Sequence, residues 1–151
     1  MEEKKVCFVD VENERAFEIE IQKISGIRKC QCCGLTYIEL DNVYGITAKI
    51  GVKQEFSQVF KQIAKAYGPV SPDVKDYVDL TVRSKETDSL LALRINVNKI
   101  DNVFLEDDGF VVVGVQDYGY SEYSYFKIRE DLVGFATLFA QSVGESEVQN
   151  D

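Results

Sequence analysis

The sequence predicts an α+β fold in which a mostly antiparallel sheet of eight or nine strands carries two main helices. Two observations lead to this fold class. Apolar and polar residues alternate strictly, as in half-buried strands, at Phe17–Gln22, Val78–Arg83 and Leu91–Val97. Apolar residues recur at helical spacing in two longer segments, Gln54–Tyr67 and Arg129–Val143.

Length and composition favour one domain. The 151 residues, 45% of them hydrophobic, are enough to bury a core without disulfides. We expect the domain to span residues 1–144 and the polar segment 145–151 to form a C-terminal tail. No apolar run reaches the roughly 18–20 residues that span a bilayer, and the charged start MEEKK is unlike a signal peptide. The expected location is therefore the cytoplasm, with no membrane contact.

The N-terminal part reads as strands followed by a helix. Strands are predicted at Val6–Val11, Phe17–Gln22, Leu35–Leu40 and Tyr44–Val52, and the stretch from Gly26 through the cysteines interrupts the pattern. The last of these strands is expected to turn inward Tyr44, Ile46, Ala48, Ile50 and Val52. The helix follows and ends at Gly68-Pro69, because this pair does not continue a helix.

The C-terminal part repeats that order. Strands are predicted at Tyr77–Arg83, Leu90–Asn98 and Glu122–Ile128. Between the last two, Asp107-Asp108-Gly109 predicts the turn of a hairpin over Val103–Gln116. The run FVVVGV after this turn is apolar at every position, which predicts a central strand covered on both faces.

The two predicted helices also resemble each other. Phe56–Gly68 and Leu132–Gly144 align without a gap and share Ala64/Ala140 and the terminal glycines. Two identities are few, but strands followed by a helix occur twice, which allows for an architecture of two similar halves.

Charge and composition narrow the classes of function. The net charge of −9 disfavours direct binding to nucleic acid, whose phosphates attract Lys and Arg. An acidic surface accounts for solubility and also suits a basic protein as partner. The chain has no histidine, which removes the commonest general base and metal ligand. We therefore expect a protein that is not an enzyme and assign no catalytic residue.

The cysteine-rich segment Cys30-Gln31-Cys32-Cys33-Gly34 contains the C-x-x-C-G spacing of a zinc knuckle. Cys30 and Cys33 are the candidate zinc ligands, and Cys32 between them is expected to point away. A tetrahedral site needs two more ligands, which Cys7 or the second chain of a homodimer would have to supply. The alternative is a turn with reduced thiols and no cofactor.

The segment Asp117–Tyr125, DYGYSEYSY, holds four of the eight tyrosines. Tyrosine combines a large rigid surface with a polar tip, and serine and glycine adapt around it, as in binding loops. The candidate binding residues are Asp117, Tyr118, Tyr120, Glu122, Tyr123 and Tyr125. Tyr125 is expected to pack inward. The alternative is a strand pair whose tyrosines line a half-exposed sheet face.

These observations favour a non-enzymatic binding protein, of inhibitor or immunity type, that meets a basic macromolecular partner through an acidic, tyrosine-rich surface. A second interpretation is a small-ligand or nucleotide-binding protein whose tyrosines stack on a ring. A third is a hydrolase that works through carboxylates and a metal.

Overall fold

The computed structural model of the chain describes residues 4–30, 32–41, 47–71, 73, 75–83, 90–106, 108–116 and 123–143. They form a sheet of eight strands, a separate two-stranded sheet and two helices, which confirms the predicted α+β fold class. The predicted tail at 145–151 lies outside the described residues. Every strand pair in the described residues is antiparallel.

The N-terminal half of the chain contains five strands, one short 3₁₀ turn and one helix. In order they are β1 (Lys5–Val9), β2 (Ala16–Glu20), η1 (Ile21–Lys23), β3 (Ile24–Lys29), β4 (Thr36–Asp41), β5 (Thr47–Val52) and α1 (Phe56–Ala66). Helix α1 begins with a capping box, because the side chains of Glu55 and Gln58 each accept from the other residue's backbone N–H.

The C-terminal half has the same elements in the same order. They are β6 (Tyr77–Arg83), β7 (Leu90–Asn96), η2 (Val97–Lys99), β8 (Ile100–Leu105), β9 (Val111–Gln116), β10 (Tyr123–Ile128) and α2 (Leu132–Val143). Asp131 caps α2, since its Oδ1 accepts from the backbone N–H of Gly134 at 2.7 Å. Gly109 adopts a φ of 86°, as a tight turn between β8 and β9 requires.

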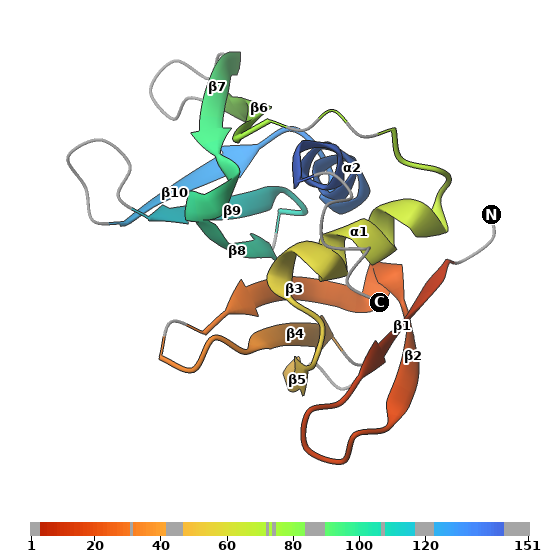
Figure 1. The fold of residues 1–151 in the computed structure, drawn as a ribbon. Coiled ribbons are helices and arrows are strands. Elements are labelled where there is room, and N and C mark those ends of the chain that lie inside the picture. The colour runs from red at the N-terminus through yellow and green to blue at the C-terminus, as the bar shows by residue number, and fades with distance from the viewer. Residues whose placement is uncertain are drawn as a thin grey trace.

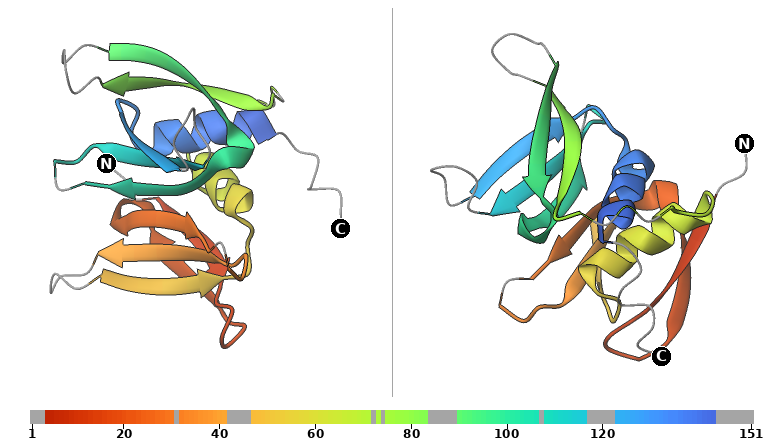
Figure 2. Two further views of the ribbon diagram at one scale, coloured as in Figure 1. Left: turned by 90° about the vertical axis from the view of Figure 1, so that its left-hand side faces the viewer. Right: turned by 45° about the horizontal axis from the view of Figure 1, so that its top comes forward.

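The eight strands are ordered β5-β4-β3-β8-β9-β10-β6-β7, and the sheet curls around the helix pair (Figure 1). Helices α1 and α2 lie side by side against one face of the sheet, as the turned views also show (Figure 2). Phenylalanines join the helices: the rings of Phe60 and Phe135 are 5.3 Å apart and those of Phe56 and Phe139 6.0 Å apart. Phe135 and Phe139 are buried, in agreement with the helical spacing of apolar residues predicted over Arg129–Val143.

Two details of the strand prediction are corrected. The stretch from Gly26 through the cysteines was expected to interrupt the pattern, whereas Ile24–Lys29 forms β3, an interior strand of the sheet. A β-bulge between Ile24 and Gly26 breaks the alternation, so that buried Ile24 and Ile27 are three residues apart instead of two. Ala48 and Leu91 were expected inside but are exposed, because each lies on an edge strand of the sheet.

The sequences of the two halves correspond with a shift of 76 residues, from Ile24 to Ile100 and from Phe56 to Leu132. Over Ala16–Lys29 the identical pairs are Ala16/Ala92, Ile19/Ile95, Lys23/Lys99 and Ile24/Ile100. Strands β3 and β8 are corresponding strands, and they pair antiparallel with Ile27 opposite Val103, its own counterpart. The halves are therefore related by an approximate twofold axis at this pair.

Hydrogen bonds repeat in the same way. The backbone N–H of Val9 donates to Gln54 Oε1, and that of Thr81 donates to Glu130 Oε1, both at 3.1 Å. The backbone N–H of Ile21 donates to the carbonyl of Lys4, and that of Val97 to the carbonyl of Asp76, both at 2.9 Å. The predicted similarity of the halves thus extends from the helices to all the elements.

Candidate functional site

Strand β8 carries a β-bulge at Asp101, and this bulge positions a buried carboxylate. The register of β8 against β9 shifts between Ile100 and Asn102, so Asp101 is the bulge residue. Only 5% of Asp101 is exposed. Its Oδ2 accepts from Gln116 Nε2 at 2.7 Å, and its Oδ1 accepts from the hydroxyl of Tyr123. Three strands, β8, β9 and β10, therefore converge on one carboxylate.

The surroundings of Tyr123 keep its phenol protonated, so that it acts as a hydrogen-bond donor. Burial of the phenol, together with its hydrogen bond to Asp101, raises the pKa of Tyr123 well above its ordinary value of 10.0. The phenol is consequently protonated across the physiological range and donates to the carboxylate. This arrangement also explains why Tyr123 is half-buried.

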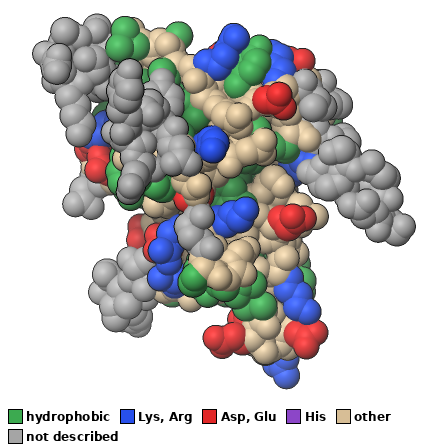
Figure 3. Space-filling view, turned by 60° about the vertical axis from the view of Figure 1, so that its left-hand side comes forward, with side chains coloured by type: hydrophobic (Ala, Val, Ile, Leu, Met, Phe, Trp, Pro, Cys, Tyr) green, Lys and Arg blue, Asp and Glu red, His purple; other side chains and the backbone are tan. Residues whose placement is uncertain are grey.

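Asp101 lines a cavity of about 730 Å³ between the two halves. Lys29 and Phe56 line it from the N-terminal half, and Asn98 and Gln116 from the C-terminal half. This volume lies in the range of small-ligand pockets, about 300–1,000 Å³. Figure 3 shows basic side chains, in blue, and acidic side chains, in red, interspersed over the face that it turns forward.

The corresponding place in the N-terminal half is closed. There the bulge residue is Ser25, and the hollow that it lines with Ile24, Leu105 and Leu132 has no space for a water molecule. Among the described residues, the open cavity therefore lies at the bulge of β8 with its carboxylate, and the equivalent place at the bulge of β3 is closed.

An aromatic patch, defined as Phe104, Tyr123 and Tyr125, lies on the sheet face opposite the helices. The ring centroids of Tyr123 and Tyr125 are 4.9 Å apart, and those of Phe104 and Tyr125 are 6.1 Å apart. Gly114 on β9 makes room for it, because a Cβ there would lie 2.9 Å from Cε1 of Tyr123. Tyr125 is 58% exposed, so the expectation that it packs inward is wrong. Its place in β10 turns it to the outer face with Tyr123.

An acidic groove, lined by Phe104, Leu105, Glu106 and Asp108, adjoins the aromatic patch. Lys127 spans it, with its Nζ 2.5 Å from Asp108 Oδ2 and 3.1 Å from Glu106 Oε1. The ion pair with Lys127 lowers the pKa of Asp108 below its ordinary value. The other predicted binding residues, Asp117, Tyr118, Tyr120 and Glu122, lie outside the described residues.

The cysteines occupy the turn between β3 and β4. The backbone N–H of Cys30 donates to the carbonyl of Leu35 at 2.8 Å, and that of Gly34 donates to the carbonyl of Cys30 at 2.9 Å. Gly34 has a φ of 76°, which glycine adopts without strain. These bonds close a short hairpin loop that carries the thiols.

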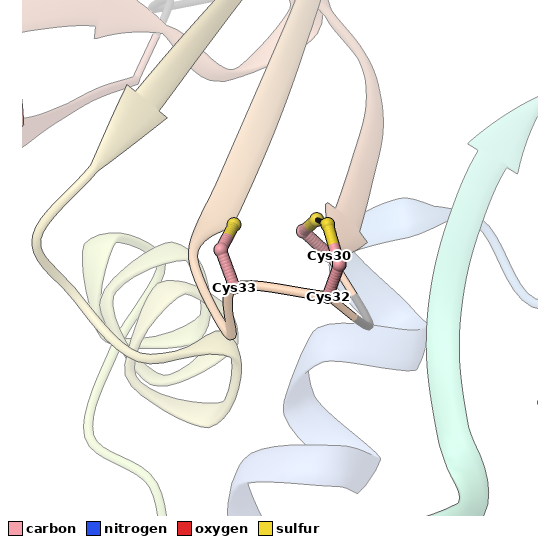
Figure 4. Close-up of side chains that lie close together, drawn as sticks. All are labelled: Cys30, Cys32 and Cys33. Atoms are coloured by element: carbon pink, nitrogen blue, oxygen red, sulfur yellow. Dashed lines mark hydrogen bonds between the residues drawn. The ribbon is translucent and has the colours of Figure 1, made fainter.

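The three sulfur atoms of Cys30, Cys32 and Cys33 lie within 4.8 Å of one another (Figure 4). The Sγ atoms of Cys30 and Cys32 are 3.0 Å apart. The expectation that Cys32 points away is therefore wrong, because side chains in a tight loop do not alternate as in a strand. Cys7 is exposed on β1 and does not belong to this group.

The neighbouring thiols and amides favour a thiolate at Cys30. Hydrogen bonds from Cys32 and Cys33, first from their side chains and then from their backbone, lower the pKa of Cys30 to about 6. The pKa of Cys32 is raised, because its thiol bonds to that neighbouring sulfur. The sulfur of Cys30 is therefore mostly a thiolate near neutral pH.

The sequence interpretation missed Asp101, Gln116 and Cys32 as candidate functional residues. Asp101 belongs to no recognisable motif, and only comparison of KIDN with KISG in the other half draws attention to it. Comparison of the chain with models of protein families, with curated proteins and with solved structures found no match. Neither described helix is long and apolar enough to cross a membrane.

Proposed function

We propose that the chain is a non-enzymatic binding protein, of inhibitor or immunity type, that docks a basic protein on the aromatic patch and its acidic groove. The observation that carries this proposal is the exposure of Tyr125, 58% of whose surface is open while its ring packs against Tyr123 and Phe104. A large aromatic ring held in place by neighbours is typical of the residues in which interface energy concentrates.

Charge complementarity supports a basic protein as the partner. Glu106 and Asp108 line the groove beside the aromatic patch, and Lys127 balances only one of these two charges. The whole chain carries a net charge of −9, so long-range attraction also favours a basic partner. In this arrangement the tyrosine supplies affinity, and the carboxylates supply orientation and a faster association.

The test compares Tyr125→Ala with Tyr67→Ala. Tyr67 is a matched control, because it is 48% exposed but lies at the end of α1. The immobilised wild-type protein and both variants capture proteins from a lysate, and the affinity for the purified captured protein is then measured. We expect Tyr125→Ala to weaken binding by about 2 kcal/mol and Tyr67→Ala to change it little.

Salt dependence tests the electrostatic part. We expect a basic captured protein whose association slows between 0.05 and about 0.5 M salt, since surface charges are screened over roughly 10 Å at 0.1 M. Equal capture by both variants, or a captured protein that is acidic, contradicts the proposal.

The cavity favours a second candidate function, the binding of a small ligand. Asp101 accepts hydrogen bonds but donates none as a carboxylate, so it suits a ligand that presents amino groups, such as an amine or a nucleobase. Thermal unfolding measured with a panel of nucleosides and amines tests this candidate, with Asp101→Asn as the variant. A stabilising ligand whose effect persists in high salt and is lost in the variant supports it, and no shift with any compound contradicts it.

A further inference from the structure

We propose that the loop between β3 and β4 binds one thiophilic d¹⁰ cation, Zn²⁺ or Cu⁺, through the Sγ atoms of Cys30, Cys32 and Cys33. The three sulfur atoms already lie within 4.8 Å of one another. Thiolates are the soft ligands that both ions prefer in proteins. This site is independent of the proposed protein-binding function, which uses the outer face of β8 and β10.

The distances between the sulfur atoms fit one ion. A tetrahedral centre with metal–sulfur bonds of about 2.3 Å separates its sulfur ligands by roughly 3.8 Å. The separation of Cys30 and Cys32 is 3.0 Å, and no pair is more than 4.8 Å apart. Rotation of the cysteine side chains therefore suffices, and the hairpin does not need to open.

The loop backbone supports bound thiolates. The carbonyl of Cys30 and the N–H of Gly34 hold the loop closed, and Gly34 accepts the positive φ that brings Cys33 back toward Cys30. The backbone amides of Cys32 and Cys33 donate to the sulfur of Cys30. Such amide–sulfur bonds are the second shell that orients ligands and offsets their negative charge.

Two cationic residues, Arg28 and Lys29, end the strand that leads into the loop. Lys29 immediately precedes Cys30, and the guanidinium of Arg28 lies 6.0 Å from the ring centroid of Tyr37, whose hydroxyl bonds to Cys33. Arg28 Nε is buried and has no hydrogen-bond partner among the described residues. Three thiolates exceed the charge of either ion, and these cations offset the excess.

The site differs from a structural zinc site, which is closed by four protein ligands. Among the described residues only three His, Cys, Asp or Glu side chains gather here. Cys32 and Cys33 are exposed. A Zn²⁺ ion would therefore keep water as its fourth ligand, whereas Cu⁺ needs only the three sulfurs. Either ion exchanges with solvent, so the chemistry is metal capture and release. Binding forms three sulfur–metal bonds, releases the thiol protons to the buffer and transfers no electron.

The experiment titrates the reduced full-length protein with Zn²⁺, and separately with Cu⁺ under anaerobic conditions, against a coloured chelator. The variants are Cys30→Ser, Cys32→Ser and Cys33→Ser, with Cys7→Ser as the matched control because Cys7 is exposed but outside the group. We expect one ion per chain, affinity lowered on the order of tenfold or more in each loop variant, and unchanged affinity in Cys7→Ser. The tighter of the two titrations identifies the ion.

Cobalt substitution gives a second readout that does not depend on affinity. Co²⁺ in the Zn²⁺ position should show sulfur-to-cobalt charge-transfer absorption that weakens stepwise as thiolates are removed. Circular dichroism of each variant distinguishes a lost ligand from a lost fold. No binding by a correctly folded wild type, full affinity in Cys32→Ser, or dependence on Cys7 overturns the proposal. One ion per two chains also overturns it, because the ligand set would then be shared as in the knuckle of a homodimer.

Discussion

The two halves of the molecule have one design but different chemistry. They share the order of elements, the β-bulge and a turn glycine of positive φ, although Gly34 and Gly109 are offset by one position. They also share the hydrogen bond from the first strand of each half to the residue two positions before its helix. They differ at the bulge, where Ser25 corresponds to Asp101, and at the turn, where the cysteines correspond to Glu106–Gly109. Each half forms the same elements with different side chains at these two places. The fold therefore does not require the carboxylate of Asp101 or the thiols of the cysteine loop.

The largest difference between the halves is expected for substitutions of corresponding core residues in the two helices. Phe135 on α2 corresponds to Val59 on α1, and both are fully buried. Phe135→Ala should lower the free energy of unfolding by about 3–5 kcal/mol, because a ring is replaced by a cavity. Val59→Ala, which removes two methyl groups, should cost roughly 2 kcal/mol. Urea unfolding measures both, and equal costs would show that the helices pack as equivalents despite their different residues.

The second largest difference in the free energy of unfolding is expected between substitutions of the two bulge residues. Asp101→Ala leaves Gln116 and Tyr123 without their common acceptor, which should cost about 1–3 kcal/mol. Ser25→Ala should change the free energy of unfolding by less than about 0.5 kcal/mol. The same urea experiment applies. If Ser25→Ala costs as much as Asp101→Ala, the two bulge side chains contribute equally to stability, and the halves do not differ at this position in the way we expect.

Two glycines in interior strands of the sheet, Gly114 on β9 and Gly26 on β3, test the close packing in each half. A Cβ at Gly114 would meet the ring of Tyr123 at 2.9–3.0 Å, so Gly114→Ala should cost about 1–3 kcal/mol through overpacking and displace Tyr123 from Asp101. A Cβ at Gly26 would meet the flexible end of Glu39, which can move, and Phe104 Cβ at 3.3 Å. Gly26→Ala should therefore cost less. Thermal unfolding followed by tyrosine fluorescence measures both costs. A larger cost for Gly26→Ala than for Gly114→Ala would contradict this expectation.

The smallest effect concerns the acidic turn. The ion pair with Lys127 depresses the pKa of Asp108 in the folded protein below the ordinary 3.8. Its contribution to stability is therefore present above pH 3.8 and lost as pH falls through the depressed value. Asp108→Asn should be slightly less stable than wild type at pH 7, and the difference should vanish in acid and shrink in salt. A difference that persists at pH 2 would show another cause. The cysteine turn has no carboxylate and offers no such pH dependence.

The sequence predicted those elements whose pattern is local. The alternation at Val78, Leu80 and Val82 and the apolar run of β9 correspond to buried strands, and the stripes of both helices face the core. Strand β3 was not predicted, because its bulge separates the buried residues by three positions where a regular strand separates them by two. Its pairing with β8 joins residues 76 positions apart, and no local pattern carries that information.

The candidate site was less predictable, for physical reasons that differ between residues. Cys32 was misplaced because a loop does not follow the alternation of the strands beside it. Asp101 stands between Ile100 and Asn102 with no motif around it, and its burial depends on Gln116 and Tyr123 from two other strands. The exposure of Tyr125 depends on which face of the sheet the helices cover, and that is a property of the whole fold.

The pairing of Ile27 with Val103 has a consequence for synthesis on the ribosome. When only the N-terminal half has emerged, β3 is an interior strand without its neighbour, an open edge that presents unpaired N–H and C=O groups. The geometry that later receives β8 accepts the β3 strand of a second nascent chain equally well, with Ile27 against Ile27. Crowded polysomes would then favour intertwined dimers, whereas completion of the chain supplies the correct strand at a far higher effective concentration.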